Sequence, residues 1–184
     1  MAPPTLSEWA CLGVLYPSPA HGFAVAARLA PSADVGRVWS VSRPLTYRSL
    51  DQLSARGYIA ATGHEPGIAG GNRTILSATR LGRARFRTWM ADATPHLRDL
   101  RSELLLKLVL GPLCGIDLAP MLRDQQVRVT QIAAGLQRDI EVGGAVDLVT
   151  LWRLESSRAA LRFLDQVGSG SASSRIPTAS RFRS

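Results

Sequence analysis

The chain has 184 residues, of which 46% are apolar and 20% are charged, a composition that supports a packed core and argues against disorder. Its net charge is +8, and it has neither the run of about 18 apolar residues of a transmembrane helix nor the leader pattern of a signal peptide. The two cysteines, Cys11 and Cys114, form no CxxC pair. We therefore expect two buried thiols in a cytoplasmic protein.

The positive charge is unevenly distributed along the sequence. Residues 1–95 carry ten arginines against five acidic residues, residues 96–167 carry nine basic against nine acidic residues, and residues 168–184 add three arginines without an acid. A basic half next to a neutral half favours a polyanionic partner for the first half. The alternative is a solvated surface that reflects an arginine-rich composition, since Lys107 is the only lysine.

Two short helices are predicted before residue 32. In "TLSEWACLGVLYPSP" the apolar residues recur at helical spacing, and Ser7 or Thr5 can cap the start. In "AHGFAVAARLAP" a second helix ends just before Pro31. The residues of this second helix that we expect to face inward are Phe23, Val25, Ala26 and Leu29.

A third helix is predicted at residues 42–56. Ser42 stands at the N-cap position, and Pro44 falls in the first turn, where its missing N–H group does no harm. Gly57 follows the last turn and is expected to end the helix. The apolar residues expected to anchor it on a three-helix core are Leu45, Leu50 and Leu53.

Two strands, "YIAA" and "RTILS", follow the third helix, and an eleven-residue glycine-rich connector, "TGHEPGIAGGN", separates them. A connector of this length exceeds the usual two to five residues of a hairpin loop, which favours a functional loop. Three helices followed by a hairpin give the order of a winged helix-turn-helix. We therefore predict a mainly α fold with a small β-hairpin, in which the hairpin is the wing.

In that fold the third helix enters the major groove of DNA. Arginine can form two hydrogen bonds to guanine, while hydroxyls and N-terminal amides suit phosphate oxygens. The residues that we expect to contact DNA are Ser42, Arg43, Pro44, Thr46, Tyr47 and Arg48 in the helix, and Asn72 and Arg73 in the wing. The alternative is an ordinary amphipathic helix with a solvated polar face.

Three segments, "LGVLYPSPAHGF", "LTYRSLDQLSARGYI" and "ATRLGRARFRTW", together resemble the PadR family of winged-helix transcriptional regulators. The residues in register with the family pattern are Tyr47, Leu50, Leu53, Gly57, Ile59, Thr79, Gly82 and Trp89. The chain departs from the pattern at Phe23, where the family has tyrosine, at Leu76, where the family often has an aromatic residue, and in a wing with few basic residues. The resemblance implies a DNA-binding regulator, expected to be a repressor, with long C-terminal helices that form a dimer.

The neutral half is predicted to be helical throughout. A helix capped by Thr79 ends before Pro95, and a second ends at Gly111–Pro112. Beyond them, apolar residues recur in alternating steps of four and three, which is typical of a coiled-coil seam. The last helix, at about 145–167, is apolar around most of its surface and needs cover on more than one side. The residues predicted to form a homodimer interface are Leu118, Leu122, Gln125, Val129, Ile132, Leu136, Leu148, Leu151 and Trp152.

This organisation predicts a DNA-binding domain with its connecting helix at 1–95, a helical dimerisation domain at 96–167 and a flexible basic tail at 168–184. The alternative to a dimer is a self-contained helical bundle. The tail either adds non-specific attraction to DNA or is inert. Phe86, Trp89 and Trp152 form a candidate pocket for a small aromatic effector, although aromatic residues at helical spacing are also typical of a core.

Enzymatic functions are disfavoured. The three histidines have no metal-ligand spacing, and neither a phosphate-binding loop nor a Gly-x-Ser-x-Gly motif is present. We expect no cofactor, no metal and no membrane partner. A non-specific architectural DNA-binding protein and a winged-helix module that binds protein remain the alternatives to a sequence-specific regulator.

Overall fold

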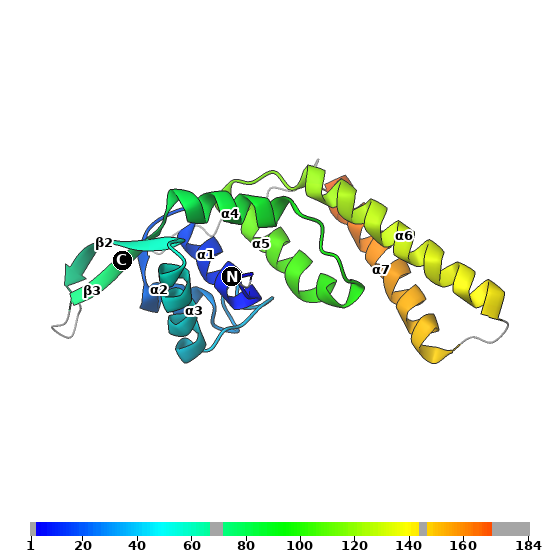
Figure 1. The fold of residues 1–184 in the computed structure, drawn as a ribbon, viewed down its shortest axis with the longest axis horizontal. Helices are drawn as coiled ribbons and strands as arrows, with labels where there is room; N and C mark the ends of the chain where they lie inside the picture. Colours follow the sequence, from blue (N-terminus) through cyan, green and yellow to red (C-terminus); the bar gives the residue numbers. More distant parts are fainter. Residues whose placement is uncertain (1–2, 67–71, 144–146, 171–184) are drawn as a thin grey trace. The chain divides into compact units, whose positions relative to one another are not determined.

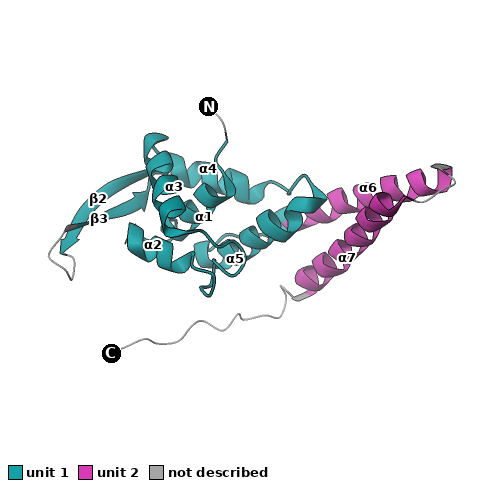
Figure 2. Cartoon of the chain, turned by 90° about the horizontal axis from the view of Figure 1, so that it is seen from below, with its two compact units in different colours: residues 1–121 teal, residues 122–184 magenta. Residues whose placement is uncertain are grey.

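The structure is a computed structural model that describes residues 3–66, 72–143 and 147–170 (Figure 1). It divides into two compact units, residues 1–121 and 122–184 (Figure 2). The helices and strands of the first unit are α1 (Leu6–Leu15), β1 (Ala20–His21), α2 (Gly22–Arg28), α3 (Arg43–Ala55), β2 (Ile59–Pro66), β3 (Asn72–Ala78), α4 (Arg80–Ala91) and α5 (Leu105–Cys114). The division falls inside α6 (Ala119–Gly143), and α7 (Leu148–Gly170) completes the second unit.

Helix α1 is the centre of the first unit, and every residue from Ser7 to Leu15 is buried. Its start is fixed by a capping box in which the Thr5 hydroxyl accepts from the Glu8 amide and the Glu8 carboxylate accepts from the Thr5 amide. Neighbouring helices cover it closely, because a Cβ atom added at Gly13 would lie 2.6 Å from a methyl group of Leu110 in α5. The helix therefore needs apolar residues on all sides.

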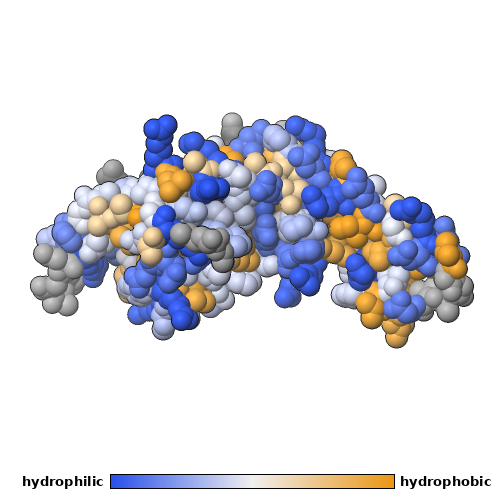
Figure 3. Space-filling model, viewed as in Figure 1, coloured by the Kyte–Doolittle hydropathy of each residue, from blue (hydrophilic) through white to orange (hydrophobic). Residues whose placement is uncertain are grey.

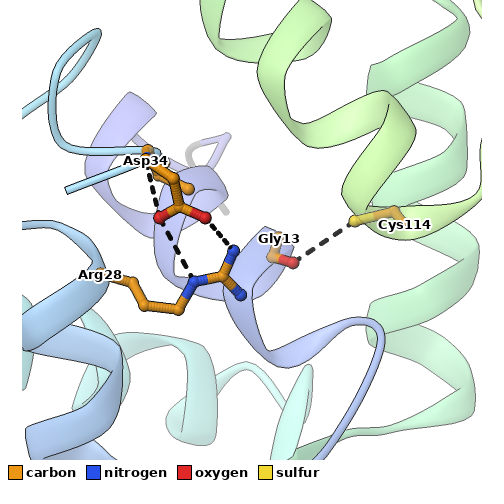
Figure 4. Close-up of polar contacts among 5 residues, drawn as sticks. Gly13, Arg28, Asp34 and Cys114 are labelled. Atoms are coloured by element: carbon orange, nitrogen blue, oxygen red, sulfur yellow. Dashed lines mark hydrogen bonds and ion pairs between the residues drawn. The ribbon is translucent and has the colours of Figure 1, made fainter. Parts of the chain in front are cut away.

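The chain that follows α2 is joined to the end of that helix by polar contacts (Figure 4). The Arg28 guanidinium donates two hydrogen bonds to Asp34, and the Val35 amide donates to the same carboxylate. These bonds hold the pKa of Asp34 below its usual value, although burial opposes them. In the same view the Cys114 thiol of α5 donates to the Gly13 carbonyl oxygen of α1 at 3.4 Å.

The sheet has three antiparallel strands in the order β1-β3-β2. The short strand β1 pairs Ala20 with Leu76, and β2 pairs with β3 from Ile59↔Ala78 to Pro66↔Asn72. Both long strands thus extend into the segment that the sequence suggested was a long connector, and only residues 67–71 separate them. The prediction of an eleven-residue loop was wrong because backbone pairing between strands does not require strongly β-forming side chains.

Helix α4 follows the sheet, and the predicted cap at Thr79 is confirmed. The Thr79 hydroxyl accepts from the Gly82 amide at 3.0 Å and donates to the Gly57 carbonyl oxygen at 2.7 Å. One side chain therefore joins the end of α3, the sheet and the start of α4. The inner face of α4 places Phe86 and Trp89 against α1, where the Trp89 and Trp9 rings stack with centroids 5.0 Å apart.

A 3-10 turn (Leu97–Asp99) and a π-helical segment (Leu100–Leu104) lead into α5. The predicted end at Gly111–Pro112 was wrong, because α5 contains Pro112 and ends only where Gly115 takes a φ of +63°. A proline in the last turn costs little, since it removes only one backbone donor near the end of the helix. The division between the two compact units falls at residue 121, and the domain boundary at residue 95 stays a prediction.

In the second unit α6 and α7 run side by side as a helical hairpin (Figures 1 and 2). The Gln126 side-chain amide of α6 donates to Asp165 of α7 at 2.6 Å, and Arg158 of α7 donates to Gln137 of α6 at 2.9 Å. The first unit thus has three helices and a three-stranded sheet that contains the wing, and further helices follow. This is the winged helix-turn-helix and the mainly α fold class that the sequence predicted.

Candidate nucleic-acid interface

The start of α3 is exposed and rich in donors. Ser42 is the N-cap residue, as predicted, and its side chain makes no capping hydrogen bond. Ser42, Arg43, Pro44 and Arg48 are all exposed. The first turn of α3 contains no acidic residue, and Asp51 is the first acid along the helix. Arg43 therefore lies in the first turn beside the positive end of the helix dipole, and Arg48 is exposed in the second turn.

Two residues of α3 face the opposite way from their predicted orientation. Thr46 is fully buried, and its hydroxyl donates to the Ser42 carbonyl oxygen at 3.0 Å, so it is unavailable for an outward contact. Leu45, expected in the core, is 42% exposed. The inward face consists of Thr46, Ser49, Leu50 and Leu53. Small polar residues fit this face because α3 approaches α1 closely, with Ser49 hydrogen-bonded to the Cys11 thiol.

Tyr47 lies beside the start of α2. Its ring is 47% exposed and occupies the space above Gly22, where an added Cβ atom would lie 2.7 Å from the ring. The absence of a side chain at Gly22 thus positions the tyrosine. His21 caps α2 by accepting from the Ala24 amide through Nδ1 at 3.1 Å.

Phe23 is the feature of this surface that the sequence prediction missed. It was expected inside but is 47% exposed, and two guanidinium groups lie over its ring. The Arg43 carbon Cζ of α3 is 4.9 Å from the ring centroid, and that of Arg73 in β3 is 5.9 Å away. Helical geometry could have predicted the exposure of Phe23, because this residue is about 200° around the helix from buried Val25.

In the wing, Arg73 is opposite Glu65 in the β2–β3 register. Asn72 is the first residue of β3, but its side chain lies outside the described part of the structure. Among the residues predicted to contact DNA, Arg43 and Arg73 therefore lie over the same ring, that of Phe23, and Tyr47 lies beside Gly22.

Charged groups in the interior of the first unit are paired. The side chain of Lys107 is fully buried and donates to Glu103 Oε1 at 2.7 Å and to the Asp92 carbonyl oxygen at 2.8 Å. Its ammonium lies 4.8 Å from the Trp89 ring centroid. Burial lowers the pKa of Lys107, and the neighbouring carboxylates oppose that shift. These bonds connect the end of α4 to α5.

Both thiols are held in the protonated form. Burial raises the pKa of Cys11 to about 12 and that of Cys114 to about 12. Because the thiolate is the reactive form, neither group has the chemistry of a nucleophile. Among residues 3–66, 72–143 and 147–170, no group of three or more histidine, cysteine or acidic side chains is arranged to hold a metal ion.

The predicted dimer residues separate into two groups. Leu122, Gln125, Val129 and Leu136 are already buried in the single chain, and Leu118 packs against Gly111 in the first unit. Ile132 is half-buried. These residues of the α6 seam are therefore buried within the single chain, whereas the prediction placed them at a contact with a second chain. In contrast, Leu148, Leu151 and Trp152 of α7 are exposed.

The aromatic residues of the candidate effector pocket are placed differently from one another. Phe86 is fully buried among Trp9, Tyr16 and Trp89, which favours the core interpretation for α4. Trp152 is 73% exposed on α7.

Over the described residues, no helix combines the length and hydrophobicity needed to cross a bilayer.

This arrangement of helices and wing defines the class of a winged helix-turn-helix protein. No protein-family profile matches the chain, and no curated protein matches it. Similar solved structures include Bacillus subtilis PadR in complex with operator DNA, with 17% identity over 90% of this chain and 98% of that chain and a TM-score of 0.47.

A structure of Bacillus subtilis PadR is similar with 17% identity over 95% of this chain and 99% of that one, at a TM-score of 0.43. A PadR-like transcriptional regulator from Bacillus cereus has 20% identity over 91% of this chain and 99% of that one, at a TM-score of 0.38. The PadR family is also the one that the three sequence segments resemble.

Proposed function

We propose that this chain is a PadR-like transcriptional regulator that binds double-stranded DNA with sequence specificity. The observation that carries the proposal is the exposed start of α3 in a winged-helix frame. Arg43 and Arg48 stand there without an acidic residue in the first turn, beside the amides of a helix N-terminus. These are the groups that bind guanine edges and phosphates in a major groove.

The charge distribution supports the same proposal. Residues 1–95 hold ten arginines and five acids. In the described part of this segment, only Arg28 and Arg56 are in ion pairs with acids. The arginines of this segment outnumber its acids by five, and a polyanion releases counterions when it binds such a surface.

We further propose that the protein acts as a cytoplasmic homodimer and represses transcription by occluding a promoter. The exposed apolar side chains of α7 support a dimer, because Leu148, Leu151 and Trp152 are not covered within the single chain. In the view of Figure 3, apolar residues gather over the second unit. A two-fold axis would relate the two α3 helices, so we expect inverted half-sites about 34–36 Å, or roughly 10 base pairs, apart or a multiple of that.

Selection of duplexes from a random-sequence library by the purified wild-type protein tests the proposal. We expect recovery of one sequence that contains an inverted repeat and that binds at least about 1,000-fold more tightly than its scrambled version. Equal affinity for the two duplexes would identify a non-specific architectural protein instead. Absence of any duplex binding at low salt would favour a winged helix that binds protein.

A further inference from the structure

Phe23 is an exposed aromatic residue at the start of α2, next to the surface proposed to bind DNA. Its ring has two cationic neighbours from two other elements, Arg43 of α3 at 4.9 Å and Arg73 of β3 at 5.9 Å from Cζ to the ring centroid. Both distances are within the roughly 6 Å over which a cation is attracted to the face of an aromatic ring. One side chain therefore contacts the proposed recognition helix and the wing at once.

Two like charges gathered at one ring need a compensating partner. Neither Arg43 nor Arg73 forms an ion pair with an acid of the described chain, although Glu65 is opposite Arg73 in the strand register. The ring face provides a weak attraction of about 0.5–1 kcal/mol for each exposed cation. The positive charge of the two guanidinium groups is therefore available to bind an anionic partner.

A guanidinium held by its face retains its N–H donors, which point outward in the plane of the group. Such a group can still form the two parallel hydrogen bonds that guanine O6 and N7 accept. Holding it in place before binding also removes part of the entropy cost of about 0.5–1.5 kcal/mol for ordering a long side chain at an interface. An aromatic platform thus improves binding without consuming any donor.

We propose that Phe23 is a positioning residue for DNA recognition. It holds Arg43 in the orientation that reads a guanine in the major groove and holds Arg73 of the wing toward the adjacent phosphate backbone. The inference rests on the proposed function and deepens it. It also gives a reason for phenylalanine at this position, because an unsubstituted ring is sufficient for a contact made through its face.

The experiment is a double-mutant cycle on affinity for the duplex recovered by selection with the wild-type protein. Phe23→Leu removes the ring and keeps an apolar side chain, and Phe23→Met serves the same purpose if the leucine variant does not fold. Phe23→Tyr keeps the ring and is the conservative control. Each is combined with Arg43→Ala, and thermal unfolding of every free protein is measured alongside.

We expect Phe23→Leu to weaken binding to the selected duplex by about three- to tenfold, because the guanidinium groups then have to be ordered when DNA binds. Phe23→Tyr should bind within about twofold of wild type, because its ring face is the same. In the Arg43→Ala background the effect of Phe23→Leu should shrink to about twofold, since only the contact with Arg73 then remains to be lost.

An equal loss from Phe23→Leu with and without Arg43 would overturn the inference, because the ring would then act on DNA directly. An unchanged affinity of Phe23→Leu would overturn it as well. A wild-type protein that does not distinguish the selected duplex from its scrambled version would instead overturn the proposed function, before any variant is compared.

Discussion

Gly82 occupies a position where no side chain fits. It is in the first turn of α4, and a Cβ atom there would lie 2.0 Å from the Tyr58 carbonyl oxygen. The close approach lets the Thr79 hydroxyl bridge the end of α3 and the start of α4. The threonine and glycine of the "ATRLG" segment are therefore explained by one contact between helix and backbone.

Gly82→Ala should lower the free energy of unfolding by about 2–4 kcal/mol, because the neighbour is backbone and cannot move aside. Chemical denaturation followed by circular dichroism measures the change. Gly135→Ala is the matched control, since it is also inside a helix and has nothing within 4 Å of the added Cβ atom. We expect the control to be neutral or to stabilise by up to about 1 kcal/mol, and a Gly82 variant as stable as this control would contradict the account.

Individual residues also show where the sequence was sufficient for prediction. The start of α3 after Ser42 and the end of the helix before Gly57 follow from local chemistry, and both are confirmed. The orientation of Leu45 and Thr46 was predicted wrongly, because helical phase and not side-chain hydrophobicity decides which of the two faces α1. Thr46, Leu50 and Leu53 share one face at steps of four and three, and Leu45 is about 100° away from Thr46.

At the scale of elements, α6 has the alternating apolar pattern of a coiled-coil helix, and the pattern predicted its packing type. It did not predict the partner, because a seam of this kind accepts either another chain or a neighbouring helix of the same chain. Val129 and Leu136 are buried within the single chain, in which α6 and α7 run side by side. The site left for a second copy is the outward face of α7, where Leu148 and Trp152 are 82% and 73% exposed.

The two faces should respond differently to an added carboxylate. Val129→Asp should unfold the α6–α7 hairpin, because an unpaired buried charge costs several kcal/mol. Trp152→Glu should leave the helix content unchanged and convert dimers into monomers, since it places charge on the exposed face. Circular dichroism and light scattering at micromolar concentration measure the two effects.

Val127→Glu is the control, because Val127 is an exposed residue of α6, and we expect it to change neither property. A Trp152→Glu protein that remains dimeric would show that α7 is not the contact between copies. A wild-type protein that is monomeric at this concentration would contradict the proposed dimer itself.

At the scale of the whole molecule, the chain combines a basic winged-helix half, residues 1–95, with a segment at residues 96–167 that has as many basic as acidic residues. The order of the elements predicted a winged helix-turn-helix followed by further helices, and this fold class is confirmed. The sequence could not predict the Phe23 platform, because that site needs α2, α3 and β3 to meet in space. Contacts between residues 20, 30 and 50 positions apart depend on tertiary packing and leave no local pattern.

The central claim is that the exposed start of α3 reads bases, and Arg43→Ala tests it most directly. Affinities of wild type and variant are measured for the selected duplex and for its scrambled version at one salt concentration, with Arg85→Ala on α4 as a control. We predict that Arg43→Ala costs about 1–3 kcal/mol on the selected duplex and relaxes the preference at one guanine, with little change on the scrambled duplex. An equal loss on both duplexes would show that Arg43 contacts only phosphate and would contradict base reading by this helix.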